Sequence, residues 1–213
     1  MRPEHRASAK PAREPEAARP AAGPPRGAPR EVRIIGGQWK RSKLPVADAP
    51  GLRPTPDRVR ETLFNWLGQN LEGWRCLDAF AGSGALGLEA ASRGAAEVTL
   101  IERDSRLARS LQATAERLKA VTVRVEAADA LAWMARGVPE HFDLVFIDPP
   151  FGADLFEPAL RGAARMLHPQ GFVYLEADRA FDDAALAEAG LRVQRHGRAG
   201  AVHYHLLQRC EPA

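Results

Sequence analysis

The feature of this 213-residue chain that most constrains its fold is an alternation of short apolar runs and helical patterns from residue 75 onward. The apolar runs cover 75–80, 97–101, 121–126, 142–147 and 172–176. The helical patterns lie near 84–93, 104–119, 129–136 and 154–167. Near-continuous apolar strands that alternate with helices are typical of a parallel sheet covered on both faces. The sequence therefore predicts an α/β fold.

The end of the chain has a different pattern. A short helical stretch near 182–189 is followed by two strand-like runs, 191–196 and 201–208, on either side of Gly197-Arg-Ala-Gly200. Two such runs around a glycine-containing turn indicate a β-hairpin. We expect the sheet to finish with an antiparallel strand and to have seven strands in all.

Charge divides the chain unevenly. Residues 1–30 and 31–60 each hold seven Lys/Arg against three Asp/Glu, so the first 60 residues carry +8. Because the whole chain carries +3, the remainder carries −5. Residues 1–30 also hold seven of the 17 prolines and one large apolar residue, Met1, and we expect this tail to be disordered.

Residues 31–70 are predicted to form a basic hairpin and a helix. Short strands are expected near 32–37 and 44–46, and Thr55-Pro56 is expected to start the helix, with Thr55 as N-cap and Pro56 at the first helical position. An apolar stripe follows, with the charged side chains of Arg58 and Arg60 expected off it. The stripe consists of Val59, Leu63, Phe64 and Leu67.

Several classes of protein are excluded. No apolar run approaches the roughly 20 residues of a membrane span, and the basic N-terminus has no apolar segment typical of a secretory signal. Cys76 and Cys210 form no zinc pattern and are expected to be free thiols. We therefore expect a cytoplasmic monomer that binds neither metal nor membrane.

A glycine-rich segment follows the first of these apolar runs. In Asp78-Ala-Phe-Ala-Gly82-Ser-Gly84-Ala-Leu-Gly87 the glycines fit G-x-G-x-x-G, where the backbone can approach a ligand at a helix N-terminus. The alternative is a tight strand-to-helix turn without a ligand. Glu102 lies 20 residues past Gly82, where a carboxylate can accept both ribose hydroxyls.

The acidic residues around this loop favour one cofactor. Asp78 would repel a pyrophosphate and suits the ammonium of S-adenosylmethionine, whose site is also expected to include Phe80. Asp129 can accept from the adenine amino group or serve as the N-cap of the next helix, and these two roles remain open. Asp104 is expected only to start a helix.

The most informative segment is Phe142-Asp-Leu-Val-Phe-Ile-Asp148-Pro149-Pro150-Phe151. Here an apolar strand ends at the sheet edge where α/β proteins bind ligands. The prolines fix the backbone, so that the Asp148 carboxylate and the Pro149 carbonyl become rigid acceptors, and Phe151 supplies a flat face. This arrangement suits a planar exocyclic amine, whose nitrogen becomes nucleophilic when its hydrogens are bound by acceptors. The alternative is a chance rigid turn.

The order of motifs resembles the bacterial RsmD family of S-adenosylmethionine-dependent methyltransferases. The matching segments cover about residues 31–210 and are carried most specifically by Leu52-Arg-Pro-Thr-Pro-Asp-Arg-Val-Arg-Glu. Arg33-Ile-Ile-Gly-Gly-Gln-Trp, the glycine loop and Asp148-Pro-Pro-Phe agree as well. The resemblance implies a seven-stranded Rossmann-like class I methyltransferase sheet over 71–213. It also implies methylation of the guanine N2 at position 966 of 16S ribosomal RNA, within the small ribosomal subunit or its assembly intermediate.

The basic N-terminal region supports contact with RNA. Its cations can neutralise phosphates, and Trp39 can stack on an unpaired base. A solvated charged face is the alternative for any single one of these cations. The cations are Lys40, Arg41, Lys43, Arg53, Arg58 and Arg60.

Two other functions compete with this interpretation. A DNA methyltransferase acting on adenine N6 or cytosine N4 uses the same Asp-Pro-Pro-Phe, but residues 31–213 leave no room for its usual target-recognition domain. A non-catalytic RNA-binding assembly protein could retain cofactor affinity. The intact Asp148 and glycine loop argue against such a loss of the catalytic site. A nicotinamide oxidoreductase is disfavoured by Asp78.

Overall fold

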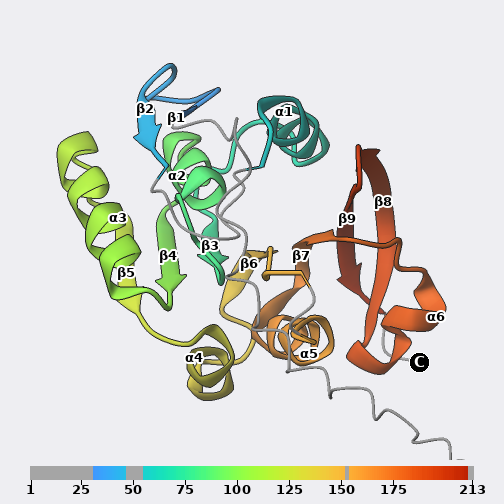
Figure 1. Cartoon of the computed structure of the whole chain (residues 1–213). Helices are drawn as coiled ribbons and strands as arrows, with labels where there is room; N and C mark the ends of the chain where they lie inside the picture. Colours follow the sequence, from blue (N-terminus) through green and yellow to red (C-terminus); the bar gives the residue numbers. More distant parts are fainter. Residues whose placement is uncertain (1–30, 47–54, 152–153, 211–213) are drawn as a thin grey trace, which may run out of the picture.

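The computed structural model describes residues 31–46, 55–151 and 154–210 (Figure 1). A seven-stranded sheet forms its centre, with strand order β5-β4-β3-β6-β7-β9-β8. The first five strands in this order are parallel, whereas β9 pairs antiparallel with both β7 and β8. The strands are β3 (Arg75–Asp78), β4 (Glu97–Glu102), β5 (Val123–Ala127), β6 (Phe142–Ile147), β7 (Leu167–Ala177), β8 (Leu191–Ala199) and β9 (Val202–Arg209). The predicted α/β fold with seven strands is confirmed.

The helices cover both faces of this sheet, because alternate side chains of each strand point to opposite faces. Along β6, Leu144 and Phe146 belong to one core cluster, and Val145 and Ile147 to the other. The first cluster lies under α1 (Asp57–Trp66), α2 (Ala85–Ser92) and α3 (Ser105–Leu118). The second lies under α4 (Ala130–Arg136), α5 (Phe156–Met166) and α6 (Asp183–Leu186), which continues into a 3-10 turn, Ala187–Ala189.

The N-terminal hairpin packs into the first of these cores. Its strands β1 (Glu31–Arg33) and β2 (Lys43–Pro45) pair antiparallel, as predicted, and lie beside α2 and α3 in Figure 1. Val32, Ile34 and Leu44 are buried in the same cluster as Leu88 of α2. The hairpin and α1 therefore share a hydrophobic core with the sheet, so the predicted boundary near residue 70 is not a boundary between cores.

Two details of the first helix were predicted incorrectly. Helix α1 starts at Asp57, with Pro56 in the N-cap position and no side-chain cap, whereas Thr55 is buried. Arg60 is fully buried, although the apolar pattern placed it off the buried stripe. Both shifts follow from polar partners that other parts of the chain supply, as described below.

Other features agree with the sequence within a few residues. Asp104 caps α3 by accepting hydrogen bonds from the backbone N–H groups of Arg106 and Leu107, as expected. Strand β7 begins at Leu167, five residues before its predicted start, because Leu167 also pairs with Phe142 of β6. Cys76 is buried, Cys210 is exposed, and both are free. Within the described ranges, the helices are too short or too polar to cross a membrane. The predicted tail, residues 1–30, lies outside the described part, as does Arg53.

Candidate active site

Acidic side chains end four neighbouring strands of the sheet. Asp78 closes β3, Glu102 closes β4, Asp148 comes directly after β6, and Glu176 lies one residue before the end of β7. These strands are parallel, so their carboxyl ends meet at one edge, where open α/β sheets bind ligands. The structure thus brings Asp78, Glu102 and Asp148, all proposed from the sequence, to one edge and adds Glu176.

The glycine loop joins β3 to α2 in a shape that requires glycine. Gly82 and Gly84 have φ angles of 51° and 76°, and Gly84 is the residue that precedes the helix. Positive φ is strained for residues with a Cβ. At Gly87 a Cβ would lie 2.2 Å from Leu100 Cδ2, so this position is set by close packing of helix on sheet. Backbone conformation at Gly82 and Gly84, and close packing at Gly87, therefore account for glycine at these three positions.

Glu102 holds this loop from the neighbouring strand. Its carboxylate oxygens accept hydrogen bonds from the backbone N–H groups of Gly82, at 3.0 Å, and Asp104, at 2.7 Å. These two contacts fix the orientation of a half-buried carboxylate. Because each carboxylate oxygen has two lone pairs, Glu102 retains acceptor capacity toward a ligand.

Asp78 lies beneath the loop with 2% of its surface exposed. Its Oδ2 accepts a hydrogen bond from the Gly87 N–H at 2.9 Å. Burial is the main reason that the pKa of Asp78 is raised to about 7; the Glu102 and Glu176 carboxylates raise it further, and the N–H groups of Gly87 and Phe80 oppose the shift. Asp78 is therefore a carboxyl group that a cationic ligand could ionise.

Asp129 performs one of its two candidate roles. It is exposed and caps α4, because its Oδ1 accepts a hydrogen bond from the Ala132 N–H at 2.9 Å. The capping interpretation is thus confirmed, while contact with adenine stays a prediction. Phe80, also placed in the cofactor site, is half-buried against the second core.

The Asp148-Pro-Pro-Phe segment leaves the sheet beside these residues. Asp148 is half-buried, Pro149 is buried, and Phe151 is 45% exposed with its ring 6.3 Å from that of Phe156. Burial and, to a smaller extent, the charges of Glu176 and Asp78 raise the pKa of Asp148. The acceptor Asp148 and the exposed ring of Phe151 are thus three residues apart, and the two prolines between them restrict the backbone.

Glu176 was missed by sequence reasoning. It is 4% exposed and accepts a hydrogen bond from the Tyr174 hydroxyl at 2.8 Å. Burial raises its pKa, while hydrogen bonds with Thr55 and Tyr174 and the charge of Arg60 oppose the rise. A signal was available, because Glu176 ends an apolar run in the way that Asp78, Glu102 and Asp148 do.

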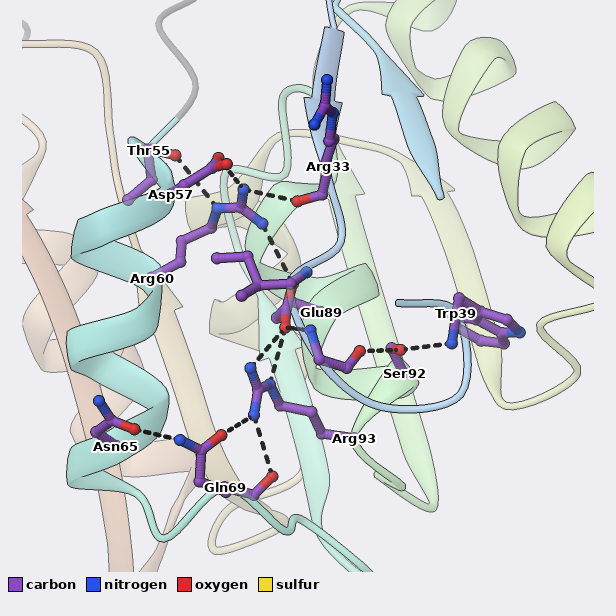
Figure 2. Close-up of polar contacts among 12 residues, drawn as sticks. Arg33, Trp39, Thr55, Asp57, Arg60, Asn65, Gln69, Glu89, Ser92 and Arg93 are labelled. Carbon is purple, nitrogen blue, oxygen red and sulfur yellow. Dashed lines mark hydrogen bonds and ion pairs between the residues drawn. The ribbon is translucent and has the colours of Figure 1, made fainter. Parts of the chain in front are cut away.

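A second cluster of buried charges fastens the hairpin to the body. Figure 2 shows Glu89 of α2 between two guanidinium groups, those of Arg60 and Arg93. Its carboxylate lies 3.2 Å from Arg60 and 2.8 Å from Arg93, and it accepts from the N–H groups of Ile35 and Gly36 at 2.7 and 2.8 Å. Arg60 also donates to the Arg33 carbonyl at 2.8 Å and to Asp57 at 2.7 Å. Arg60 is therefore engaged inside the protein, which corrects its predicted place on the RNA surface.

The other basic residues of the hairpin and α1 remain accessible. Lys40, Arg41, Lys43 and Arg58 are exposed, and Lys43 pairs with Glu31 at 2.7 Å. Trp39 is half-buried, and its backbone N–H donates to Ser92 Oγ at 3.0 Å (Figure 2). The hairpin thus presents an anchored turn with charged side chains toward solvent.

Comparisons with known proteins agree with this site. Residues 32–208 match a family model described as "Conserved hypothetical protein 95". Ribosomal RNA small subunit methyltransferase D of Escherichia coli is 45% identical over 182 residues, which are 84% of this chain and 90% of the relative. The enzyme of that name from Haemophilus influenzae is 40% identical over 183 residues, 84% of this chain and 94% of the relative.

Solved structures show the same architecture. That of yhhF from Escherichia coli superposes with a TM-score of 0.73 at 39% identity, covering 85% of this chain and 99% of that one. TrmN from Thermus thermophilus gives a TM-score of 0.59 at 27% identity, covering 71% of this chain and 48% of that one. The chain has the class I methyltransferase fold and belongs to the "Conserved hypothetical protein 95" family, which is the RsmD family of methyltransferases.

Proposed function

We propose that this protein transfers a methyl group from S-adenosylmethionine to the exocyclic N2 of a guanine in 16S ribosomal RNA, at position 966. The observation that carries the proposal is the arrangement of Asp148, Pro149 and Phe151 next to the glycine loop at one sheet edge. The similarity to ribosomal RNA small subunit methyltransferase D of Escherichia coli supports the choice of small-subunit ribosomal RNA.

The glycine loop and its acids fit the cofactor. Gly82, Gly84 and Gly87 allow the loop to turn closely from β3 into α2, and we propose that Glu102 uses its remaining acceptor capacity for the ribose hydroxyls. Asp78 suits its ammonium group, since a cation next to a buried carboxyl group favours the ionised form. Phe80 and Asp129 are proposed for the adenine side. Bound S-adenosylmethionine supplies an electrophilic methyl group, and we propose no metal for this step.

Asp148 and the Pro149 carbonyl prepare the nucleophile. The lone pair of the guanine amine is delocalised into the ring, and acceptors on its hydrogens favour a pyramidal nitrogen. Held by the glycine loop and its acids, S-adenosylmethionine would supply the methyl carbon that bonds to this nitrogen, and its sulfur would leave as a neutral thioether. Asp148 stabilises the positive charge that develops on nitrogen and takes the proton that the amine loses.

The exposed cations provide a surface for RNA. Lys40, Arg41, Lys43 and Arg58 lie on the hairpin and α1. We propose that Trp39 also contacts RNA, as does Arg53, which lies outside the described residues. Phosphate contacts of this kind give affinity with little sequence preference. The target base must leave its stack to reach Asp148, which favours a loop nucleotide. We propose that the protein acts in the cytoplasm as a monomer on the small subunit or its assembly intermediate.

Methyl transfer from labelled S-adenosylmethionine tests this function directly. Small-subunit particles lacking the modification, naked 16S RNA and double-stranded DNA serve as parallel substrates, and mass spectrometry of the digested product identifies the methylated nucleoside. We expect N2-methylguanosine from the particle or the RNA and none from DNA. Label in DNA adenine or cytosine would favour the DNA methyltransferase, and binding without transfer would favour a non-catalytic assembly protein.

A further inference from the structure

The carboxylate of Glu176 has no part in the function proposed above, yet it lies next to Asp148. In the parallel pairing of β6 with β7, Ile147 is opposite Leu175, so Asp148 and Glu176 are the next residues of adjacent strands. Adjacent strands lie about 4.8 Å apart. In agreement with this pairing, burial and then the charge of Glu176 raise the pKa of Asp148.

Both side chains belong to the same face of the sheet. Phe146 and Tyr174 precede Asp148 and Glu176 by two residues each, and their rings meet at 6.2 Å in the core under α1 and α2. Residues two apart in a strand share a face. The Tyr174–Glu176 hydrogen bond agrees with this placement.

The orientation of Glu176 is fixed by groups from separate parts of the chain. The Tyr174 hydroxyl donates to Oε1 at 2.8 Å, and a hydrogen bond joins Glu176 to the buried Thr55 that precedes α1. A carboxylate has about four acceptor positions, so these two bonds leave capacity for a further donor. With 4% of its surface exposed, Glu176 meets little competing water.

We infer that Glu176 accepts the N1–H of the target guanine while Asp148 accepts from N2, so that Glu176 selects guanine among purines. This inference rests on the proposed function. The N1–H and the N2 amine of guanine lie on one edge of the base, and two adjacent carboxylates match two adjacent donors. A purine with a lone pair at N1 would face a buried carboxylate without a hydrogen between them.

The size of the effect follows from that mismatch. Sites that hydrogen-bond a substrate N–H reject the analogue lacking it by about 10⁴–10⁵-fold, because a buried polar group is left unpaired. Asp148 is only half-buried, so water can partly replace a missing hydrogen bond and the discrimination between the two bases should be smaller. We expect wild-type protein to prefer guanine over 2-aminopurine at the target position by at least about 100-fold. 2-Aminopurine retains the C2 amine but has a lone pair at N1.

The test compares kcat/KM for two RNAs, with guanine or 2-aminopurine at the target, in wild-type protein and in Glu176→Gln. The amide can donate to N1 of 2-aminopurine, so we expect the preference for guanine to fall at least about tenfold. RNA with 6-thioguanine, which keeps N1–H and the C2 amine, controls for the altered 6-position and should behave like guanine.

Two further variants keep the test decisive. Glu102→Gln is the same substitution at the same sheet edge and should weaken cofactor binding without changing the preference for guanine. Tyr174→Phe keeps the Glu176 carboxylate but releases Oε1, and it should reduce the preference even if Glu176→Gln does not fold. The unfolding transition of each variant, measured by scanning calorimetry without cofactor, identifies the variants that are folded.

Failure of this inference is distinguishable from failure of the proposed function. Equal wild-type rates on guanine and 2-aminopurine would overturn the role of Glu176, as would an unchanged preference in folded Glu176→Gln and Tyr174→Phe. Absence of N2-methylguanosine from the wild-type reaction on guanine RNA would instead overturn the proposed function.

Discussion

Arg60 offers a sharp test of the structure, because its sequence context suggests an RNA contact and its position makes it a buried ion-pair partner. Its side chain is fully buried, 3.2 Å from the Glu89 carboxylate and 2.7 Å from that of Asp57. It also donates to the carbonyls of Thr55 and Arg33. Arg60→Met keeps apolar volume and removes all of these contacts.

The expected cost is large. Removing one partner of a buried ion pair destabilises a protein by about 3–5 kcal/mol, because the remaining charge loses its compensation. Arg93 still lies 2.8 Å from Glu89, so we expect the lower end, about 3 kcal/mol. For domains of about 150–250 residues each kcal/mol lowers Tm by roughly 2–4 °C, which gives a loss of about 6–12 °C.

The assay pairs this variant with Arg58→Ala, two residues away on the same helix. Arg58 is exposed, so its removal should leave Tm within about 2 °C and weaken RNA binding with a smaller salt dependence. Scanning calorimetry gives Tm, and RNA titrations at several salt concentrations give the salt slope. The reasoning would be refuted if Arg60→Met changed Tm by less than 2 °C and reduced the salt slope as Arg58→Ala does.

Three further predictions concern the acidic edge. Asp148→Ala should slow single-turnover methyl transfer by about 10²–10³-fold with little change in cofactor affinity. Asp148→Asn should retain partial activity. If the rate of Asp148→Ala stayed within about threefold of wild type, the motif would be only a rigid turn. Glu102→Ala should weaken S-adenosylmethionine binding by about 1.5–3 kcal/mol in calorimetry while the protein stays folded, and unchanged affinity would contradict the ribose assignment. The pKa of Asp78 is about 7, so protonation should weaken cofactor binding as pH falls below 7, by up to about tenfold per pH unit. Asp78→Asn should flatten this pH dependence, and an equal dependence in both proteins would argue against the ammonium contact.

Much of the molecule follows from local sequence alone. The five apolar runs, each long enough for a strand and separated by helical patterns, restrict the chain to a parallel sheet with helices on both faces. The glycine spacing after β3 and the two prolines after β6 act through backbone geometry, which depends on residue type rather than on distant neighbours. The sheet and the edge that carries the proposed site could therefore be predicted before the structure was known.

Other features depended on tertiary contacts. Arg60 is buried because Glu89, 29 residues later in the chain, provides a compensating charge, and no periodicity within α1 contains that information. Thr55 likewise leaves the expected cap position and lies near Glu176, which belongs to β7, much later in the chain. Strand order, which only the folded structure provides, makes Asp148 and Glu176 neighbours. A charged side chain can be buried only where partners compensate its charge, and partners distant in sequence come together only in the folded protein.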